Sequence, residues 1–425
     1  MGLKGGDNGV KAQLQLRYPR AFCRFQTLGD LRKNTDTDRA KTTIVQDGNV
    51  MLMQIPKSCC SFDAYVSVVQ KMLKTLLASA SLVCLVFDEP DAMSNAKREE
   101  QVRRDQTRSI AMVQSSSDLI TTPRDDNYVL QDLRSISNCH DVVAHRPARP
   151  RFFDAVVFEA VRRLNTTMQT WNRDGHRTIL VVDGLDPRGA DREMGVAREP
   201  VIWASDDDFC ELFQRRERVG EGDLKMACFE RRVRDLVADQ TLDLELLVQA
   251  TIDTDSFCVT LNDVGKRAVR GQEETQVKGA LAFRERPQKR PFDDYADDGS
   301  GGGASYLVCD YAALFHQIQA DLWTKVPENP LERLLAMRFL TTSLALCGSD
   351  FVTVAGLRAD LIFENVKAFV SQFPTLVATF AKVDGTATDV QEVVPALRRM
   401  VVLCSDRIRL KRQREAAENV DETLL

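Results

Sequence analysis

The segment TTIVQDGN, residues 42–49, is a short run of β-branched and apolar residues that ends in Asp47 and a glycine. Three further runs have the same form: SLVCLVFD ends in Asp88, TILVVD in Asp183 and LELLVQATID in Asp253. Short apolar runs bounded by turn residues are typical of strands that are buried on both faces. The sequence therefore predicts four central strands, each followed by an acidic residue.

Between the first two runs, residues 62–77 show the period of an amphipathic helix. Its apolar face consists of Tyr65, Val68, Val69, Met72, Leu73 and Leu76. A strand, a helix and a second strand form a β-α-β unit, whose two strands are parallel. Repetition of this unit predicts an α/β fold with a mostly parallel central sheet, helices on both faces and functional groups at the carboxyl ends of the strands.

The composition is that of an ordinary globular protein, with 425 residues, 44% of them hydrophobic and 28% charged. Lys and Arg number 57 and Asp and Glu 62, and the net charge of −5 excludes a generally basic nucleic-acid coat. The eleven cysteines form no C-x-x-C pair, and no apolar run approaches the roughly 20 residues that span a bilayer. We therefore expect an intracellular protein, cytoplasmic or nuclear, with reduced cysteines and no membrane partner.

Two stretches interrupt the alternation of strands and helices. Residues 96–150 are rich in Arg, Asp, Gln and Ser and have little apolar periodicity. Residues 270–305 end in RERPQKRPFDDYADDGSGGGAS, a basic, then acidic, then glycine-rich run that predicts a flexible insertion. We expect one catalytic domain, with an N-terminal part at 1–269, the insertion at 270–305 and a helical C-terminal part at 306–425.

Carboxylates are the candidate catalytic groups, because the four histidines are dispersed and neither G-x-S-x-G nor a P-loop motif occurs. Glu221 and Asp223 lie two residues apart in VGEGDLKMA, where a loop enters a helix. Asp253 and Asp255 have the same spacing in TIDTDSF, and Asp350 follows an apolar helix in ALCGSDF. Clustered carboxylates repel one another unless cations lie between them, and oxygen-only ligation favours Mg²⁺ or Mn²⁺. The usual chemistry of such sites is two-metal phosphodiester hydrolysis.

The order and spacing of seven acids resemble those of the 5′-nuclease superfamily, which contains flap endonucleases and 5′→3′ exoribonucleases. These acids are Asp47, Asp88, Glu221, Asp223, Asp253, Asp255 and Asp350. The start MGLKG, the LRYP after it, SNC at 137–139, GEGD-x-K-M, and GSDF without a glycine hairpin are similar to the exoribonuclease (XRN) branch. The resemblance covers residues 1–270 and 305–370. It implies a PIN-like 5′-nuclease fold with a helical, arch-like insertion, and two Mg²⁺ or Mn²⁺ ions held by the seven acids, with Asp47 and Asp88 taking part in catalysis.

A second feature of this family follows Asp88. In KREEQVRRD, Lys97, Gln101 and Arg104 have the i, i+4, i+7 spacing of one helix face, so their side chains can converge on one phosphate. The resemblance implies that these residues and Arg103 bind nucleic acid. It also implies catalytic roles for Lys97 and Arg104, with Lys97 stabilising charge in the transition state.

The resemblance implies a 5′→3′ exonuclease that acts on 5′-monophosphorylated RNA, with single-stranded RNA favoured over DNA as the partner. Two alternatives remain: a structure-specific DNA flap endonuclease or exonuclease, and a catalytically silent relative that binds nucleic acid. The intact set of seven acids argues against silence. Asp183 lies outside this set and is expected to be structural, and the sequence points to no particular protein partner.

Overall fold

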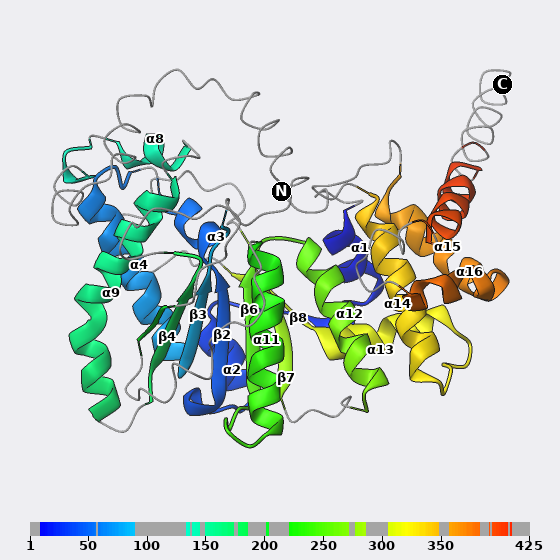
Figure 1. Ribbon diagram of the computed structural model, residues 1–425, viewed down its shortest axis with the longest axis horizontal. Helices are drawn as coiled ribbons and strands as arrows, with labels where there is room; N and C mark the ends of the chain where they lie inside the picture. The colour runs from blue at the N-terminus through cyan, green and yellow to red at the C-terminus, as the bar shows by residue number, and fades with distance from the viewer. Residues whose placement is uncertain are drawn as a thin grey trace, which may run out of the picture. The chain divides into compact units, whose positions relative to one another are not determined.

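The structure of the chain is a computed structural model, shown in Figure 1. The residues that it describes are 9–56, 58–89, 133–136, 138–144, 149–173, 177–185, 201–203, 221–271, 277–285, 305–347, 357–382, 391, 393–406 and 409.

The described strands form one sheet in the order β1-β8-β7-β6-β2-β3-β4-β5. Their bounds are β1 (Phe22–Phe25), β2 (Thr42–Asp47), β3 (Leu82–Val86), β4 (Ile179–Asp183), β5 (Val201–Trp203), β6 (Leu246–Thr251), β7 (Lys278–Arg284) and β8 (Tyr306–Asp310). β2 is parallel to β3 and β6, β3 is parallel to β4, and β6 is parallel to β7, whereas β5 runs antiparallel to β4. The predicted α/β fold with a mostly parallel sheet is confirmed.

The register aligns the ends of three neighbouring strands. Asp47 of β2 pairs with Val86 of β3, and Val86 pairs in turn with Asp183 of β4. Because these strands are parallel, the residues that follow them all lie at the same edge of the sheet, where the strands end. We call this row and the residues directly after it the carboxyl edge.

Helices cover both faces of the sheet. One face packs against α2 (Leu28–Asn34), α3 (Gly48–Met53), α4 (Phe62–Ser79), α8 (Cys139–Ala144) and α9 (Arg149–Arg173), and the other against α11 (Gly222–Ala238). Alternate residues of β3 serve the two layers: Val83 and Leu85 face the first group of helices, and Cys84 and Val86 face α11. This alternation follows from the period of two residues along a strand.

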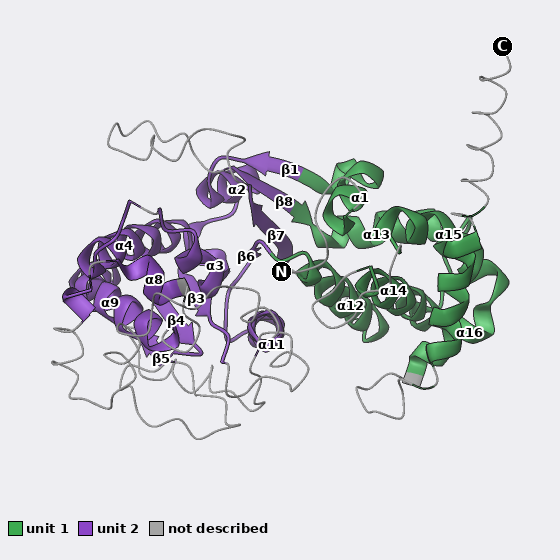
Figure 2. Ribbon diagram, turned by 90° about the horizontal axis from the view of Figure 1, so that it is seen from above, with its two compact units in different colours: residues 1–22, 253–274, 309–425 green, residues 23–252, 275–308 purple. Residues whose placement is uncertain are grey.

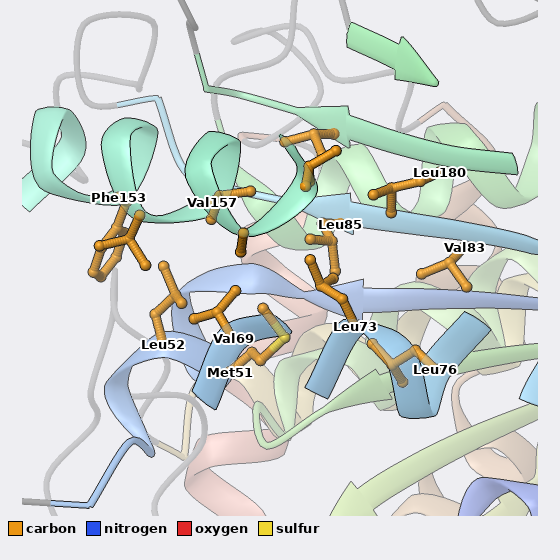
Figure 3. Packing of buried hydrophobic residues seen from close by; sticks show 14 of the residues in the cluster. Met51, Leu52, Val69, Leu73, Leu76, Val83, Leu85, Phe153, Val157 and Leu180 are labelled. Atoms are coloured by element: carbon orange, nitrogen blue, oxygen red, sulfur yellow. The ribbon is translucent and has the colours of Figure 1, made fainter. Parts of the chain in front are cut away.

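Figure 3 shows the layer between the sheet and helices α4 and α9. Leu73 on α4, Val157 on α9 and Leu85 of β3 belong to this layer, and all three are fully buried. Helix α4 begins at Phe62 because the Ser61 hydroxyl accepts a hydrogen bond from the Ala64 N–H at 3.3 Å. Burial of each such aliphatic side chain stabilises the fold by about 1.5–3 kcal/mol.

The chain divides into two compact units (Figure 2). Unit 1 comprises residues 1–22, 253–274 and 309–425, and unit 2 comprises residues 23–252 and 275–308. Unit 2 contains the carboxyl edge with the helices described above. The helices of unit 1 include α1 (Val10–Arg17), η1 (Pro19–Ala21), α12 (Asp255–Val269), α13 (Tyr311–Leu322), α14 (Pro330–Ala345), α15 (Ala359–Gln372), α16 (Pro374–Ala378) and η5 (Thr379–Lys382), and residues 393–406 are also helical. Helices α12 and α14 cross closely at Gly265, where an added Cβ would lie 2.9 Å from Leu334 Cδ1.

Two strands lie where the sequence predicted other structure. β7 falls inside the expected flexible insertion at 270–305, and β8 opens the range 306–425 that was expected to be helical. Both expectations are wrong at these positions, because β7 and β8 each supply a run of buried apolar residues to the sheet. The charged run next to β7 obscured this signal in the sequence. Residues 286–304 lie outside the described part. Among the helices that the structure describes, none has the length and apolar character to cross a membrane.

Candidate functional site

Asp47 sits where β2 turns into α3. It is the N-cap of that helix, and its Oδ1 accepts a hydrogen bond from the Val50 N–H at 3.0 Å. The next residue, Gly48, lies against the ring of Phe87, and an added Cβ would come within 2.3 Å of Phe87 Cζ. The glycine after Asp47 is therefore required by the packing of Phe87, and it lets the helix start directly at the strand end.

Asp88 is joined to the first turn of α11. Its Oδ1 accepts a hydrogen bond from the Gly222 N–H at 2.8 Å, across 134 positions of sequence. An added Cβ on Gly222 would lie 3.2 Å from the same oxygen, so glycine permits this close approach. The amino end of a helix stabilises a negative charge. The contact thus brings the segment that carries Glu221 and Asp223 to the end of β3.

A buried ion cluster lies next to this contact. Lys225 is on the first turn of α11, where its N–H donates to the Glu221 carbonyl at 3.0 Å. Its side chain is fully buried, and its Nζ donates to Glu89 Oε1 and, at 3.1 Å, to Asp183 Oδ1. The Glu89 and Asp183 side chains are only 6% and 8% exposed. We call Lys225, Glu89 and Asp183 the Lys225 cluster.

The backbone around the Lys225 cluster is tightly packed. The Phe87 N–H donates to the Asp183 carbonyl at 2.8 Å and extends the pairing of β3 with β4 by one residue. Gly184, directly after β4, has a φ of +99°. An added Cβ there would lie 2.3 Å from the Phe87 carbonyl oxygen and 2.8 Å from Lys225 Nζ. No other residue type fits at Gly184 without moving β3 or the lysine.

The carboxylates at the carboxyl edge and at the adjoining start of α11 are of two kinds. Asp183 and Glu89 are buried and paired with Lys225, whereas Asp47, Asp88, Glu221 and Asp223 are half-buried. These four offer oxygen ligands only, which suit a hard divalent cation such as Mg²⁺ or Mn²⁺. Within the described residues, no three Asp, Glu, His or Cys side chains converge closely enough to form a ready-made ion site. The oxygen atoms of Asp47, Asp88, Glu221 and Asp223 are nevertheless of the ligand type that Mg²⁺ and Mn²⁺ prefer.

The other predicted site residues are placed elsewhere. Asp253 and Asp255 belong to unit 1, where Asp255 is the first residue of α12 and its N–H donates to Asp253 Oδ1 at 3.4 Å. The remaining predicted residues, Asp350, Lys97, Gln101, Arg103 and Arg104, lie outside the described part of the chain. The structure therefore describes four of the seven predicted acids together in one unit and two more in the other.

Glu89 and Lys225 were not among the site residues predicted from the sequence. A signal for Lys225 was nevertheless present, because it shares the i, i+4, i+8 row of α11 with the buried Phe229 and Val233. A lysine on a core-facing row must be paired with an acid. Asp183, which was expected to be structural, accepts a hydrogen bond from Lys225 Nζ at 3.1 Å.

No protein-family model matches this chain, and no curated protein matches it either.

Proposed function

We propose that the chain is a metal-dependent nuclease of the 5′-nuclease type that hydrolyses phosphodiester bonds from the 5′ end, with single-stranded RNA as its substrate. One observation carries the proposal: the Gly222 N–H holds Asp88 against the segment containing Glu221 and Asp223. Asp47 ends the strand next to the one that Asp88 follows. Acids that are far apart in the sequence thus share one edge of a parallel sheet, the usual place of an active site in such folds.

Asp47, Asp88, Glu221 and Asp223 would hold the divalent ions. Two bound Mg²⁺ or Mn²⁺ ions would supply an activated water and stabilise the leaving oxygen. The Gly222 N–H that bonds to Asp88 is an uncharged donor, so it orients this carboxylate without pairing it with a cation. Lys97, Gln101 and Arg104 are proposed to bind the terminal 5′-phosphate, and Lys97 to stabilise transition-state charge.

The test is cleavage of 5′-phosphorylated single-stranded RNA, single-stranded DNA and flapped DNA in Mg²⁺, Mn²⁺ or EDTA. We expect RNA cleavage that requires the metal and is faster for a 5′-monophosphate than for a 5′-hydroxyl end. Preference for flapped DNA would favour a flap endonuclease instead. No metal-dependent cleavage of any substrate would favour a silent relative that binds nucleic acid.

Asp223→Asn gives a sharper test of the carboxylates. We expect roughly a 100-fold or greater loss of cleavage with the fold intact, because an ion ligand is lost while the shape of the side chain is kept. Asp235→Asn is the matched control: Asp235 is exposed on the same helix, about 18 Å further along its axis. Wild-type cleavage by Asp223→Asn would contradict the proposed role of the carboxylates.

A further inference from the structure

Lys225 is a costly residue to bury. Its side chain has no exposed surface, and moving an ammonium group out of water costs several kcal/mol before its partners compensate. Buried ion pairs can often be replaced by apolar residues of similar volume without loss of stability. Stability alone therefore does not explain why a lysine occupies this otherwise apolar row of α11. We look for its role in the neighbouring site.

The cluster is connected directly to the proposed ion-binding acids. Glu89, one partner of Lys225, is the chain neighbour of Asp88. Helix α11 thus donates hydrogen bonds to two consecutive residues that follow β3. The Gly222 N–H donates to Asp88, and the Lys225 ammonium donates to Glu89. A single hydrogen bond lets a carboxylate rotate about the contact, whereas two contacts on adjacent residues fix the peptide between them.

The second partner adds a third strand end. Lys225 Nζ also donates to Asp183 at the end of β4, and the Asp183 carbonyl accepts from the Phe87 N–H. One ammonium group thereby ties β3, β4 and α11 at the carboxyl edge. It also places a positive charge beside the two buried carboxylates, Glu89 and Asp183, which would otherwise compete with Asp88 for a divalent cation.

We propose that Lys225 is a positioning residue for metal binding: its ammonium, held by Glu89 and Asp183, fixes Asp88 in the orientation that ligates a divalent ion. The inference rests on the proposed function, because it assumes that Asp88 is an ion ligand. In this role Lys225 would bind Glu89 and Asp183 rather than the substrate or the ion. It acts through the residues next to Asp88, as partners behind the ligands of a metal site do.

A second ion pair on α11 supplies the control. Arg234 is also buried, and its Nε donates to Glu230 Oε1 at 2.8 Å. It lies about 13 Å further along the helix than Lys225, and its Nη1 donates to the Val277 carbonyl at 3.0 Å. Arg234→Met removes a buried cation from the same helix without touching the carboxyl edge. A general loss of stability would therefore appear in both variants.

The experiment measures the Kd for Mn²⁺ by titration calorimetry of the full chain, together with the thermal midpoint in EDTA. We expect Lys225→Met to weaken Mn²⁺ binding by about 10- to 100-fold, and Arg234→Met to leave the Kd within about twofold of wild type. Both variants are expected to lower the thermal midpoint. Lys225→Arg, which keeps the charge, is expected to recover most of the affinity.

Lys225→Met leaves two buried carboxylates without this cation, and the variant could fail to fold. The double variant Glu89→Gln, Lys225→Met removes one charge of each sign, and the same 10- to 100-fold loss is expected of it. An unchanged Kd in whichever of the two variants folds would overturn the inference, as would an equal loss in Arg234→Met. Absence of Mn²⁺ binding and of metal-dependent cleavage in the wild type would overturn the proposed function itself.

Discussion

Gly184 provides a quantitative test of how tightly the carboxyl edge is built. Its φ of +99° is outside the range that residues with a Cβ adopt readily, and the space for a Cβ is already filled. The substitution Gly184→Ala adds two costs. The backbone conformation costs about 1–2 kcal/mol in a residue other than glycine. The contact of 2.3 Å with the Phe87 carbonyl oxygen must be relieved by moving β3, at about another 1–3 kcal/mol.

Gly271 separates these two costs. It follows α12 with a φ of +70°, and an added Cβ would meet no atom within 4 Å. Gly271→Ala therefore carries the conformational cost alone, about 1–2 kcal/mol. We expect Gly184→Ala to lower the free energy of unfolding by about 2–5 kcal/mol. The contact with Phe87 alone accounts for roughly 2 kcal/mol more than the loss in Gly271→Ala.

Urea unfolding followed by circular dichroism gives both values, provided that the m-value of each variant matches the wild type. Gly271 lies in unit 1 and Gly184 in unit 2, so each variant is compared with the unfolding transition of its own unit. Equal losses for the two alanines would refute the close packing of Gly184 against β3. A loss below about 1 kcal/mol in Gly184→Ala would refute the backbone conformation as well.

Two further predictions concern the helical layer of unit 2. Hydrogen bonds from Arg162 and Arg163 lower the pKa of Glu159 to about 2, so its contribution to stability is present above its ordinary value of 4.5 and is lost as the pH falls toward 2. Glu159→Gln is therefore expected to lower the free energy of unfolding by about 1–2 kcal/mol at pH 7, a figure reduced for the exposure of Arg162, and by less at pH 3. Urea titrations at the two pH values measure this loss, and an equal loss at both would contradict the prediction. Tyr65→Phe removes the hydrogen bond between the Tyr65 hydroxyl and His140 Nδ1, 2.8 Å long, and is expected to cost about 1 kcal/mol in the same assay, whereas unchanged stability would show that this bond contributes nothing.

The central strands were predictable because each is a buried apolar run ended by a polar residue. β2, β3, β4 and β6 were all expected from such runs, and α4 was expected at 62–77 and occupies Phe62–Ser79. β7 could not be found in the same way. Its centre is GALAF, and its small residues next to a strongly charged segment give a weak strand signal.

The candidate site was predictable only in part, because an ion pair between residues far apart in the chain produces no local sequence pattern. The sequence places Asp47 and Asp88 at strand ends, and the register puts their strands side by side. The link from Lys225 to Glu89 spans 136 positions and depends on how α11 packs on the sheet. Periodicity shows that Lys225 is buried, but only the fold shows which acids neutralise it.

The partners of the strand-end acids separate residues that look equivalent in the sequence. Asp47, Asp88 and Asp183 each follow an apolar run, and the runs themselves give no reason to rank them. Asp183 accepts from an ammonium group, whose full charge offsets its own, whereas Asp47 and Asp88 accept from peptide N–H groups at helix starts. A peptide dipole orients a carboxylate without cancelling its charge, which supports the proposed role of Asp88 as an ion ligand. An acid at a strand end is thus a stronger candidate ligand when a helix amino end holds it than when a buried lysine does.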